Sequence, residues 1–330
     1  MQLSDTPIST PILITGAAGF IGQAVAAALL SDGIEVVGLD NLNAYYDPAL
    51  KNARLARLRE YEGFTFHKLD LADESGMQAL FGAHEFLQVV HLAAQAGVRY
   101  SIEAPQQYIS SNIAGLTVLL ECCAGHGVQH LLYASSSSVY GDTERTPFSE
   151  QDTADRPRSL YAATKRAGEL LAWSYARTYG LPSTGIRYFT VYGPWGRPDM
   201  AAMTFAEDLR AGRPLKVFGD GRQRRAFTYI GDAVAGTLAI LERGAPARQP
   251  PAALYNLGSE EDVELLDFIR ILGRETGVEV EIEFAPEPQG EMRATLPDMS
   301  AMRRDFGFEP RVGLEEGLTE FVHWYREYSG

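Results

Sequence analysis

Apolar runs of five to seven residues recur along the first two thirds of the chain and alternate with helical patterns. Six stretches are interpreted as strands, at 11–15, 35–40, 65–70, 89–94, 128–134 and 183–187, and those at 11–15 and 128–134 as buried strands. Helical patterns separate several of them, at 23–30, 48–61 and 105–124. Because strands and helices alternate, this part of the chain predicts an α/β fold with parallel strands.

The last third of the chain has a less regular order of elements. Its pattern predicts a helix then a strand in 205–218, a helix at 232–241, a strand at 254–257, and amphipathic helices at 265–276 and 314–328. Pro and Gly predict loops at 188–200 and 245–251. The predicted fold is a doubly wound parallel Rossmann sheet, followed by a smaller α/β substrate-binding lobe on its C-terminal side.

A glycine-rich turn directly follows the first predicted strand. Gly16, Gly19 and Gly22 are spaced three apart around Phe20 and Ile21, and a helical pattern follows. Glycines allow a tight turn and close approach of a pyrophosphate to the helix N-terminus. Asp40 ends the next strand, 18 residues after Gly22, where a carboxylate accepts hydrogen bonds from an adenosine ribose.

This turn therefore predicts a dinucleotide site. A carboxylate at position 40 would repel a 2′-phosphate, which favours NAD over NADP. Asn41, beside it, is the other side chain that could face the ribose. The fourth strand runs into small residues around Ala93, which suggests close approach to the cofactor, and His91 before them is interpreted as a core histidine.

A candidate acid–base group follows the fifth strand. That strand ends in four consecutive serines, 135–138, and Tyr161 and Lys165 lie four residues apart in the next helical pattern. This spacing puts both side chains on one face of a helix, where an ammonium would favour the phenolate. Taken alone, the pair could be a helical coincidence. Together with a serine hydroxyl and a nucleotide site, it predicts removal of a proton from an alcohol while hydride leaves for nicotinamide.

Composition excludes several other classes of protein. The 330 residues are 45% hydrophobic and 22% charged, and a net charge of −14 argues against a nucleic-acid partner. The first residues do not resemble a signal peptide, and the longest apolar run, Ala24–Leu30, is too short to span a membrane. The two cysteines, Cys122 and Cys123, are adjacent, so neither a disulfide framework nor a metal site is expected, and a cytoplasmic location fits.

Several motifs together resemble one enzyme group. The glycine spacing is usual in the extended short-chain dehydrogenase/reductase superfamily, and five stretches look like its UDP-glucuronate 4-epimerases. These are 40–58, 91–100, the four serines, 189–200 and 224–230. The resemblance covers nearly the whole chain. It implies NAD-dependent epimerisation at C4 of a UDP-sugar, UDP-glucuronic acid to UDP-galacturonic acid.

The resemblance also implies roles for individual residues. Ser136, Tyr161 and Lys165 correspond to the catalytic set, and Asp70, with Leu71 beside it, to the adenine contact, although Asp70 could instead cap a helix. For the substrate, the implied residues are Ser137, Ser138, Thr190, Arg197 and Arg225. Arg197 would meet the uronate carboxylate, to which a planar guanidinium is well matched. Arg225 would grip the diphosphate.

The resemblance further suggests how the chain is divided and how it assembles. Residues 1–190 would form the NAD-binding Rossmann domain, with 228–260 returning to it. Residues 191–227 and 261–330 would form the sugar-nucleotide lobe. A homodimer through two helices of each subunit is implied.

Two departures leave alternatives open. Position 226 is alanine where the group has aspartate, and Glu291 replaces an aspartate after Gly290. A UDP-glucose 4-epimerase and a UDP-glucuronate decarboxylase remain possible, whereas a 4,6-dehydratase would need an Asp-Glu pair where Ser137 and Ser138 stand. A non-catalytic NAD(H)-sensing protein on the same fold would have no need of the serine, tyrosine and lysine together.

Overall fold

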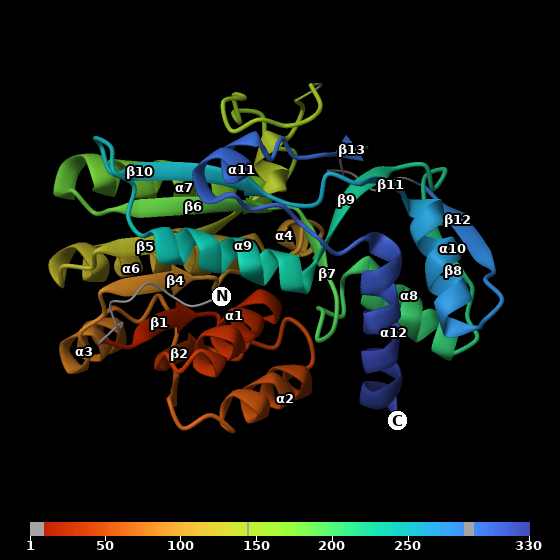
Figure 1. The fold of residues 1–330 in the computed structure, drawn as a ribbon, viewed down its shortest axis with the longest axis horizontal. Coiled ribbons are helices and arrows are strands. Elements are labelled where there is room, and N and C mark those ends of the chain that lie inside the picture. The colour runs from red at the N-terminus through yellow and green to blue at the C-terminus, as the bar shows by residue number, and fades with distance from the viewer. Residues whose placement is uncertain (1–9, 144, 287–293) are drawn as a thin grey trace.

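The computed structural model describes residues 10–143, 145–286 and 294–330, and Figure 1 shows them folded into a larger and a smaller lobe. In these residues the larger lobe is built on a seven-stranded sheet with the order β10-β6-β5-β4-β1-β2-β3. Its strands are β1 (Ile12–Thr15), β2 (Val36–Asp40), β3 (Phe64–Lys68), β4 (Gln88–His91), β5 (His130–Ser136), β6 (Ser183–Tyr188) and β10 (Ala252–Leu257). All neighbouring pairs are parallel.

The strand order reverses beside β1. The chain runs outward from β1 to β2 and β3, then returns to place β4 on the other side of β1. A parallel sheet with such a reversal binds ligands at the carboxyl ends of the strands next to it. β1 and β2 are completely buried, as their unbroken apolar runs predict. The predicted doubly wound Rossmann fold is confirmed.

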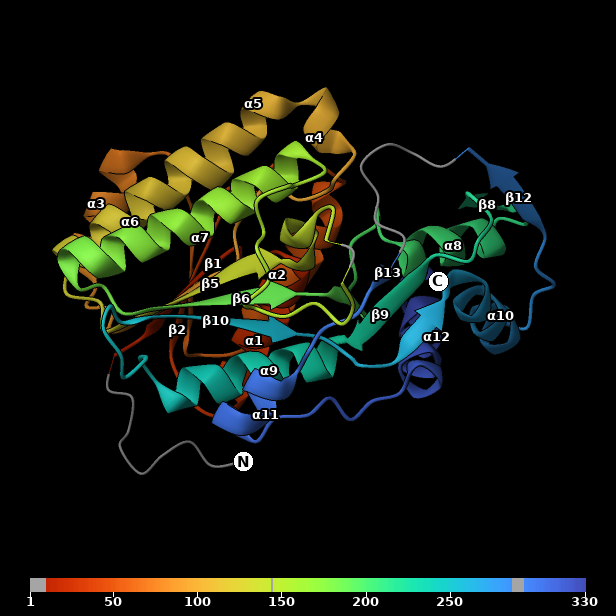
Figure 2. The same ribbon diagram turned by 90° about the horizontal axis from the view of Figure 1, so that it is seen from above.

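Helices cover both faces of this sheet, as Figure 2 shows. One face carries α1 (Phe20–Ser31), α9 (Ile230–Arg243) and α11 (Ser300–Phe306), with α2 (Pro48–Leu58) packed beside α1. The other face carries α3 (Glu74–Ala83), α6 (Gly115–Gly125) and α7 (Leu160–Tyr179). Each face has its own buried apolar cluster, so the sheet is the middle of three layers.

The helix predicted at 105–124 contains an irregular turn. After α4 (Tyr100–Glu103), the chain forms α5 (Pro105–Tyr108), a π-helical turn (Ile109–Ala114) and α6. Asn112 lies in the π turn. Its side-chain oxygen accepts a hydrogen bond from the N–H of Gln95, and its side-chain nitrogen donates to the carbonyl oxygen of Gln95 and to the hydroxyl of Thr164. Among the described helices, the stretch Pro105–Gly125 is long and apolar enough to cross a bilayer by length and composition alone. In this fold 44% of the most apolar part of that stretch is buried inside the protein.

The smaller lobe has its own sheets, helices and apolar core. One sheet contains β7 (Thr190–Tyr192), β9 (Arg224–Tyr229), β11 (Asp262–Glu264) and β13 (Ala294–Thr295), and the other pairs β8 (Leu215–Phe218) with β12 (Ile282–Ala285). The helices are α8 (Ala201–Arg210), α10 (Leu265–Thr276) and α12 (Leu314–Ser329). The prediction that 188–200 is all loop was wrong, because Tyr188 ends β6 and residues 190–192 pair with β9.

The chain passes between the lobes more than once. α9 lies against the large sheet and β10 pairs with its strand β6. The structure also packs α11 against α9 and β10, although residues 300–306 fall in the segment that the sequence assigns to the smaller lobe. The exact division of the chain into domains stays a prediction.

Candidate active site

A cavity of about 650 Å³ lies where the two lobes meet. The two lobes both contribute to its wall, and every candidate site residue from the sequence lines it. These residues are Gly16, Gly19, Phe20, Ile21, Gly22, Asp40, Asn41, Asp70, Leu71, Ala93, Ser136, Ser137, Ser138, Tyr161, Lys165, Thr190, Arg197 and Arg225. The fold thus gathers in one place side chains that are up to 209 positions apart, from Gly16 to Arg225.

The glycine turn is held in place by Asp40. Gly16 has a φ of 75°, and a Cβ on Gly22 would lie only 2.1 Å from the carbonyl oxygen of Gly16, so both positions need glycine. The Asp40 carboxylate accepts hydrogen bonds from the backbone N–H of Ala18 (3.2 Å) and of Leu42 (2.8 Å). Burial raises the pKa of Asp40, and Lys51 and these N–H groups oppose the shift.

Asn41 and Asp70 contact each other across the ends of β2 and β3. The Asn41 amide donates to an Asp70 oxygen at 2.8 Å, while the other Asp70 oxygen accepts from the N–H of Ala72. The alternative that Asp70 caps the next helix was wrong. Asp73 is the N-cap of α3, since its carboxylate accepts from the N–H of Gly76.

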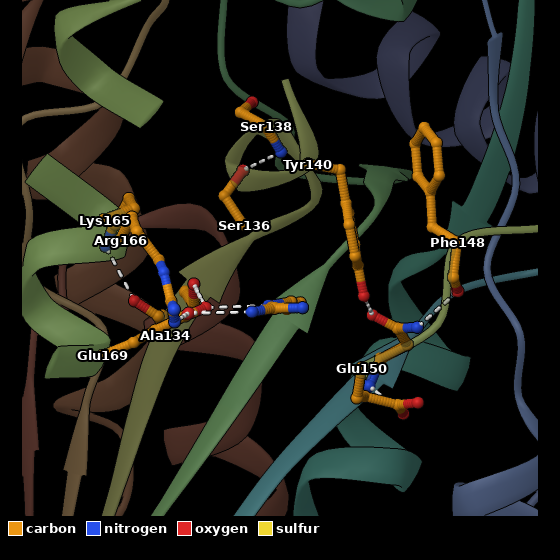
Figure 3. A network of polar contacts seen from close by, with 12 residues as sticks. Ala134, Ser136, Ser138, Tyr140, Phe148, Glu150, Lys165, Arg166 and Glu169 are labelled. Atoms are coloured by element: carbon orange, nitrogen blue, oxygen red, sulfur yellow. Dashed lines mark hydrogen bonds and ion pairs between the residues drawn. The ribbon is translucent and has the colours of Figure 1, made fainter. Parts of the chain in front are cut away.

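Tyr161 lies in the first turn of α7, which begins after the capping residue Ser159. Burial raises the pKa of the Tyr161 phenol, while a hydrogen bond with Ser136 and the charge of Arg197 act in the opposite direction. The expectation that Lys165 lowers this pKa stays a prediction. Lys165 donates to the carbonyl oxygen of Ala134 at 2.8 Å, as Figure 3 shows.

Lys165 occupies a strongly buried position. Burial and the nearby charge of Arg197 lower the pKa of its ammonium to about 8, and Glu169, one helical turn further on, opposes this shift. Ser136 ends β5, and its hydroxyl accepts from the N–H of Ser138 at 3.2 Å (Figure 3). The catalytic candidates are therefore held by the end of β5 and the start of α7.

A buried ionic network behind these residues was missed from the sequence. Glu169 accepts hydrogen bonds from the hydroxyl of Ser135 (2.5 Å), from Arg187 on β6 (2.8 and 2.9 Å) and from Arg166 (2.7 Å). Burial alone would raise the pKa of Glu169, but Arg187 and the other donors hold it below its usual range. The network joins α7 to β5 and β6, and so it fixes the position of Lys165 relative to the serines (Figure 3).

Arg197 is paired within the protein. Its Nε and Nη2 donate to the two oxygens of Asp199 at 3.0 and 2.8 Å, and Tyr45 donates to the same carboxylate at 3.0 Å. Asp199 and Tyr45 also line the cavity and were not predicted. The available signal was the position of Asp199, two residues after the arginine in the same loop.

Other residues around the site have simpler roles. Thr190 begins β7, and Arg225 on β9 donates to the carbonyl oxygen of Arg224. The buried His91 is hydrogen-bonded to the hydroxyl of Thr15, and burial lowers its pKa to about 3, so it is neutral at physiological pH. Ala226 lies in a buried apolar cluster with aromatic side chains, and Glu291 is outside the described residues.

The doubly wound sheet, the glycine turn and the serine, tyrosine and lysine at its carboxyl edge define the class of Rossmann-type enzymes that use a nicotinamide dinucleotide. The chain belongs to the NAD dependent epimerase/dehydratase family, whose model matches residues 12–258. NAD is accordingly its cofactor.

Three known proteins illustrate the similarity. UDP-glucuronate 4-epimerase 4 of Arabidopsis thaliana is 46% identical, over 96% of this chain and 75% of that protein. The crystal structure of UDP-glucuronic acid 4-epimerase from Bacillus cereus, with UDP-glucuronic acid and NAD, is 34% identical, has a TM-score of 0.90 and covers 96% of this chain and 99% of that one. UDP-glucose 4-epimerase from Thermotoga maritima, with UDP-glucose, is 31% identical at a TM-score of 0.88, over 97% and 100%.

Proposed function

We propose that the protein is a UDP-glucuronate 4-epimerase, an isomerase that converts UDP-glucuronic acid to UDP-galacturonic acid. The observation that carries this proposal is the placement of Arg197. Its guanidinium lines the same cavity as Ser136, Tyr161 and Lys165, and its charge is close enough to act on the Tyr161 phenol. A uronate carboxylate bound by Arg197 would bring the rest of the sugar close to the acid–base group.

The residues that line the cavity fit a bound dinucleotide. Gly16 and Gly22 leave no room for a side chain at the turn, and the N-terminus of α1 faces the cavity through Gly19 and Phe20. Bound NAD supplies an acceptor for the hydride from C4 and a donor that returns it to the opposite face of the sugar. Overall no redox change results, so the cofactor need not leave.

Tyr161 performs the proton transfers. As a phenolate it accepts the proton of the C4 hydroxyl while the hydride leaves C4, which produces a 4-keto sugar. After the sugar has turned over in the site, the same phenol returns the proton to the C4 oxygen. Ser136 and Arg197 are the groups that favour the phenolate in this structure, and Ser136 also offers a hydroxyl to the reacting oxygen.

The carboxylate requires restraint during this cycle. A 4-keto uronate is a β-keto acid, which loses carbon dioxide easily when its carboxylate bond aligns with the carbonyl. Arg197, together with Ser137 and Ser138, would bind the carboxylate and hold it away from that alignment. These three residues line one cavity.

NMR of UDP-glucuronate incubated with the enzyme and NAD tests the proposal. We expect signals of UDP-galacturonate to appear until the two epimers reach equilibrium. A UDP-pentose as the main product would identify a decarboxylase. No conversion of the uronate, by protein that binds NAD, would overturn the proposal.

A second candidate is epimerisation of UDP-glucose. The observation in its favour is that Asp199 already pairs with Arg197, which partly neutralises the charge offered to a uronate. The same NMR assay with UDP-glucose distinguishes the two. Conversion of UDP-glucose at an efficiency equal to or above that of UDP-glucuronate would favour the neutral sugar.

We also propose that the protein is a homodimer through the helical face of α6 and α7, which lie side by side in Figure 2. Leu170 and Trp173 on α7 expose large apolar side chains, as does Ile109 in the π turn that precedes α6. Sedimentation should give twice the monomer mass, and Trp173→Glu should shift it toward the monomer. A monomeric wild-type protein at micromolar concentration would contradict this.

A cytoplasmic location, without membrane or nucleic-acid partners, completes the proposal. Cys122 and Cys123 are buried free thiols, which suits a reducing compartment, and the net charge of −14 disfavours nucleic acid. Fractionation of cells that express the tagged protein tests the location. Recovery with membranes after a high-salt wash would contradict it.

A further inference from the structure

Arg54, on α2, is a fully buried arginine whose hydrogen bonds reach both lobes. Its Nη1 donates to the carbonyl oxygen of Ala18 at 3.1 Å and to the phenol oxygen of Tyr46 at 2.6 Å. Its Nε and Nη2 donate to the carbonyl oxygen of Trp195 at 3.2 and 2.6 Å, and Nη2 also donates to that of Gly196 at 3.0 Å. One guanidinium thus joins three backbone carbonyls from two distant segments.

Burying the charge of Arg54 costs free energy of folding, because the guanidinium loses its hydration. Among the residues that the structure describes, no carboxylate pairs with Arg54 within 4.0 Å, so its charge is buried without an ion-pair partner. Burial lowers the pKa of Arg54, which expresses that cost, and Tyr46 opposes the shift. A buried charge without an ion-pair partner is costly unless hydrogen bonds offset its lost hydration, and Arg54 donates five.

At one end, the contact lies in the cofactor turn. Ala18 stands between Gly16 and Gly22, and its N–H donates to Asp40, the residue predicted to meet the adenosine ribose. The Ala18 peptide therefore has its N–H bound to Asp40 and its carbonyl bound to Arg54. Movement of Arg54 would move the turn that is predicted to hold the pyrophosphate.

At the other end, the contact lies immediately before Arg197. Trp195 has a φ of 65°, in the left-handed region that non-glycine residues rarely adopt, and its carbonyl accepts two of the Arg54 hydrogen bonds. The Gly196 carbonyl accepts the third hydrogen bond that Arg54 makes with this segment. The backbone that leads into Arg197 is thus held in an uncommon conformation by Arg54.

The Trp195 ring is held by contacts that do not involve Arg54. It packs against Trp324 and Tyr328 of α12, with centroid distances of 5.4 and 5.8 Å. Arg57, one turn after Arg54 on α2, lies over the ring at 4.8 Å. Arg57 therefore touches the same tryptophan through its side chain and provides a matched control for the backbone contacts of Arg54.

We propose that Arg54 is a positioning residue that fixes Arg197 relative to the NAD-binding turn, and so determines preference for a uronate. The proposal rests on the proposed function, because it assigns Arg197 to the substrate carboxylate. Arg54 acts through backbone carbonyls and does not touch the sugar. Without its fork, Arg197 would no longer be held at a fixed distance from the cofactor and from Tyr161.

The test compares Arg54→Lys with Arg57→Ala. Lysine keeps the charge, but a single ammonium cannot bridge the Ala18 carbonyl to those of Trp195 and Gly196. We expect Arg54→Lys to weaken UDP-glucuronate binding to the NAD-loaded protein at least about tenfold, and UDP-glucose binding by less than about threefold. Its affinity for NAD, titrated into the apo-protein, should fall as well. Arg57→Ala should leave all three dissociation constants near the wild-type values.

Two outcomes would overturn the proposal. One is a folded Arg54→Lys protein whose three affinities match the wild type. The other is equal weakening of UDP-glucuronate and UDP-glucose binding, whatever the NAD affinity, which would show that Arg54 does not determine the preference for a uronate. If Arg54→Lys does not fold, Tyr46→Phe removes one acceptor of Nη1, and it should shift the same sugar ratio in the same direction. An unchanged ratio in that variant would then overturn the proposal.

These binding measurements also separate this inference from the proposed function. If the wild-type protein binds UDP-glucuronate but does not epimerise it, the proposed function fails. The dependence of the sugar ratio and of NAD affinity on Arg54 would still be measured.

Discussion

Arg197 and Asp199 form a bidentate ion pair, in which Nε and Nη2 of the arginine donate to the two carboxylate oxygens. This geometry is the one that an arginine would use for the carboxylate of a uronate. Nη1 of Arg197 donates no hydrogen bond to any residue that the structure describes. The remaining edge of the guanidinium is therefore the part that a substrate carboxylate would meet, with Asp199 holding the opposite edge.

Arg197→Ala should discriminate between the two candidate sugars. Loss of a charge-assisted pair in a closed site costs about 2–4 kcal/mol, which corresponds to a fall of about 30- to 700-fold in kcat/KM for UDP-glucuronate. UDP-glucose, with a neutral hydroxymethyl group, should be affected far less. Arg197→Lys should rescue only partly, because an ammonium lacks the fork. Equal losses on both sugars would make Arg197 a structural brace for its loop.

Asp199→Asn should change the pH dependence of the reaction. The negative charge of Asp199 raises the pKa of Tyr161, whereas Arg197 lowers it. Removing the charge of Asp199 should lower the phenol pKa, so the phenolate would form at lower pH. The acidic limb of the kcat/KM profile should therefore move to lower pH. Tyr45→Phe, which removes a hydrogen bond to Asp199 but no charge, should move it less, and a shift to higher pH would refute this account.

Tyr161→Phe should leave the fold and NAD binding intact but lower turnover at least about 100-fold, the usual scale for a lost general base. The ring is retained, and its edge-to-face packing with Tyr108, at 6.3 Å between centroids, should persist. Circular dichroism and NAD titration serve as controls for folding and binding. Turnover near the wild-type rate in the folded variant would rule out Tyr161 as the base.

The local motifs were predictable because their chemistry depends on short spacing. The glycines of 16–22 must follow a strand and open a helix, and Tyr161 and Lys165 share a helical face wherever that helix lies. Parallel strands then bring the ends of β1, β2 and β5 to one edge. These rules predict the glycine turn, Asp40, the serines after β5, Tyr161 and Lys165 as residues of one site, and all of them line the cavity. Thr190, Arg197 and Arg225, which also line it, were expected only from the resemblance to the UDP-glucuronate 4-epimerases.

What could not be predicted depends on contacts between distant elements. Glu169 on α7 meets Arg187 on β6, and Arg54 meets Trp195, only because of how the layers pack. β7 has three residues between Tyr188 and Gly193, and its pairing with β9 outweighs the local turn signals. The spacing of Tyr161 and Lys165 likewise gives no sign that the Lys165 ammonium donates to the carbonyl oxygen of Ala134 on β5.

Asp40→Asn should reduce the preference of the enzyme for NAD over NADP. The Asp40 carboxylate already accepts two backbone N–H groups, and its remaining lone pairs can accept from the ribose hydroxyls. Loss of its charge removes the repulsion of a 2′-phosphate. The Kd for NADP divided by the Kd for NAD should therefore fall about tenfold or more. Titration of wild-type and variant apo-protein with both cofactors measures this ratio. Tighter binding of NADP by the wild type would instead point to Asn41 as the ribose contact.

Two buried histidines should make the fold sensitive to acid. Burial lowers the pKa of His91 to about 3 and that of His130 to about 4, from 6.5. Below pH 6.5 the unfolded chain binds protons that the native histidines do not, so the free energy of unfolding falls as the pH falls.

For each histidine, the loss between pH 7.5 and pH 5 should be about 2 kcal/mol. His91→Gln and His130→Gln cannot be protonated, so each should reduce that loss by about 2 kcal/mol, even if it lowers stability at pH 7.5. Urea unfolding at the two pH values measures the difference. His323→Gln, at an exposed position on α12, serves as the control and should behave as the wild type. An identical pH dependence in all four proteins would show that the buried histidines gain protons in the native state, through local opening of the sheet around β4 and β5.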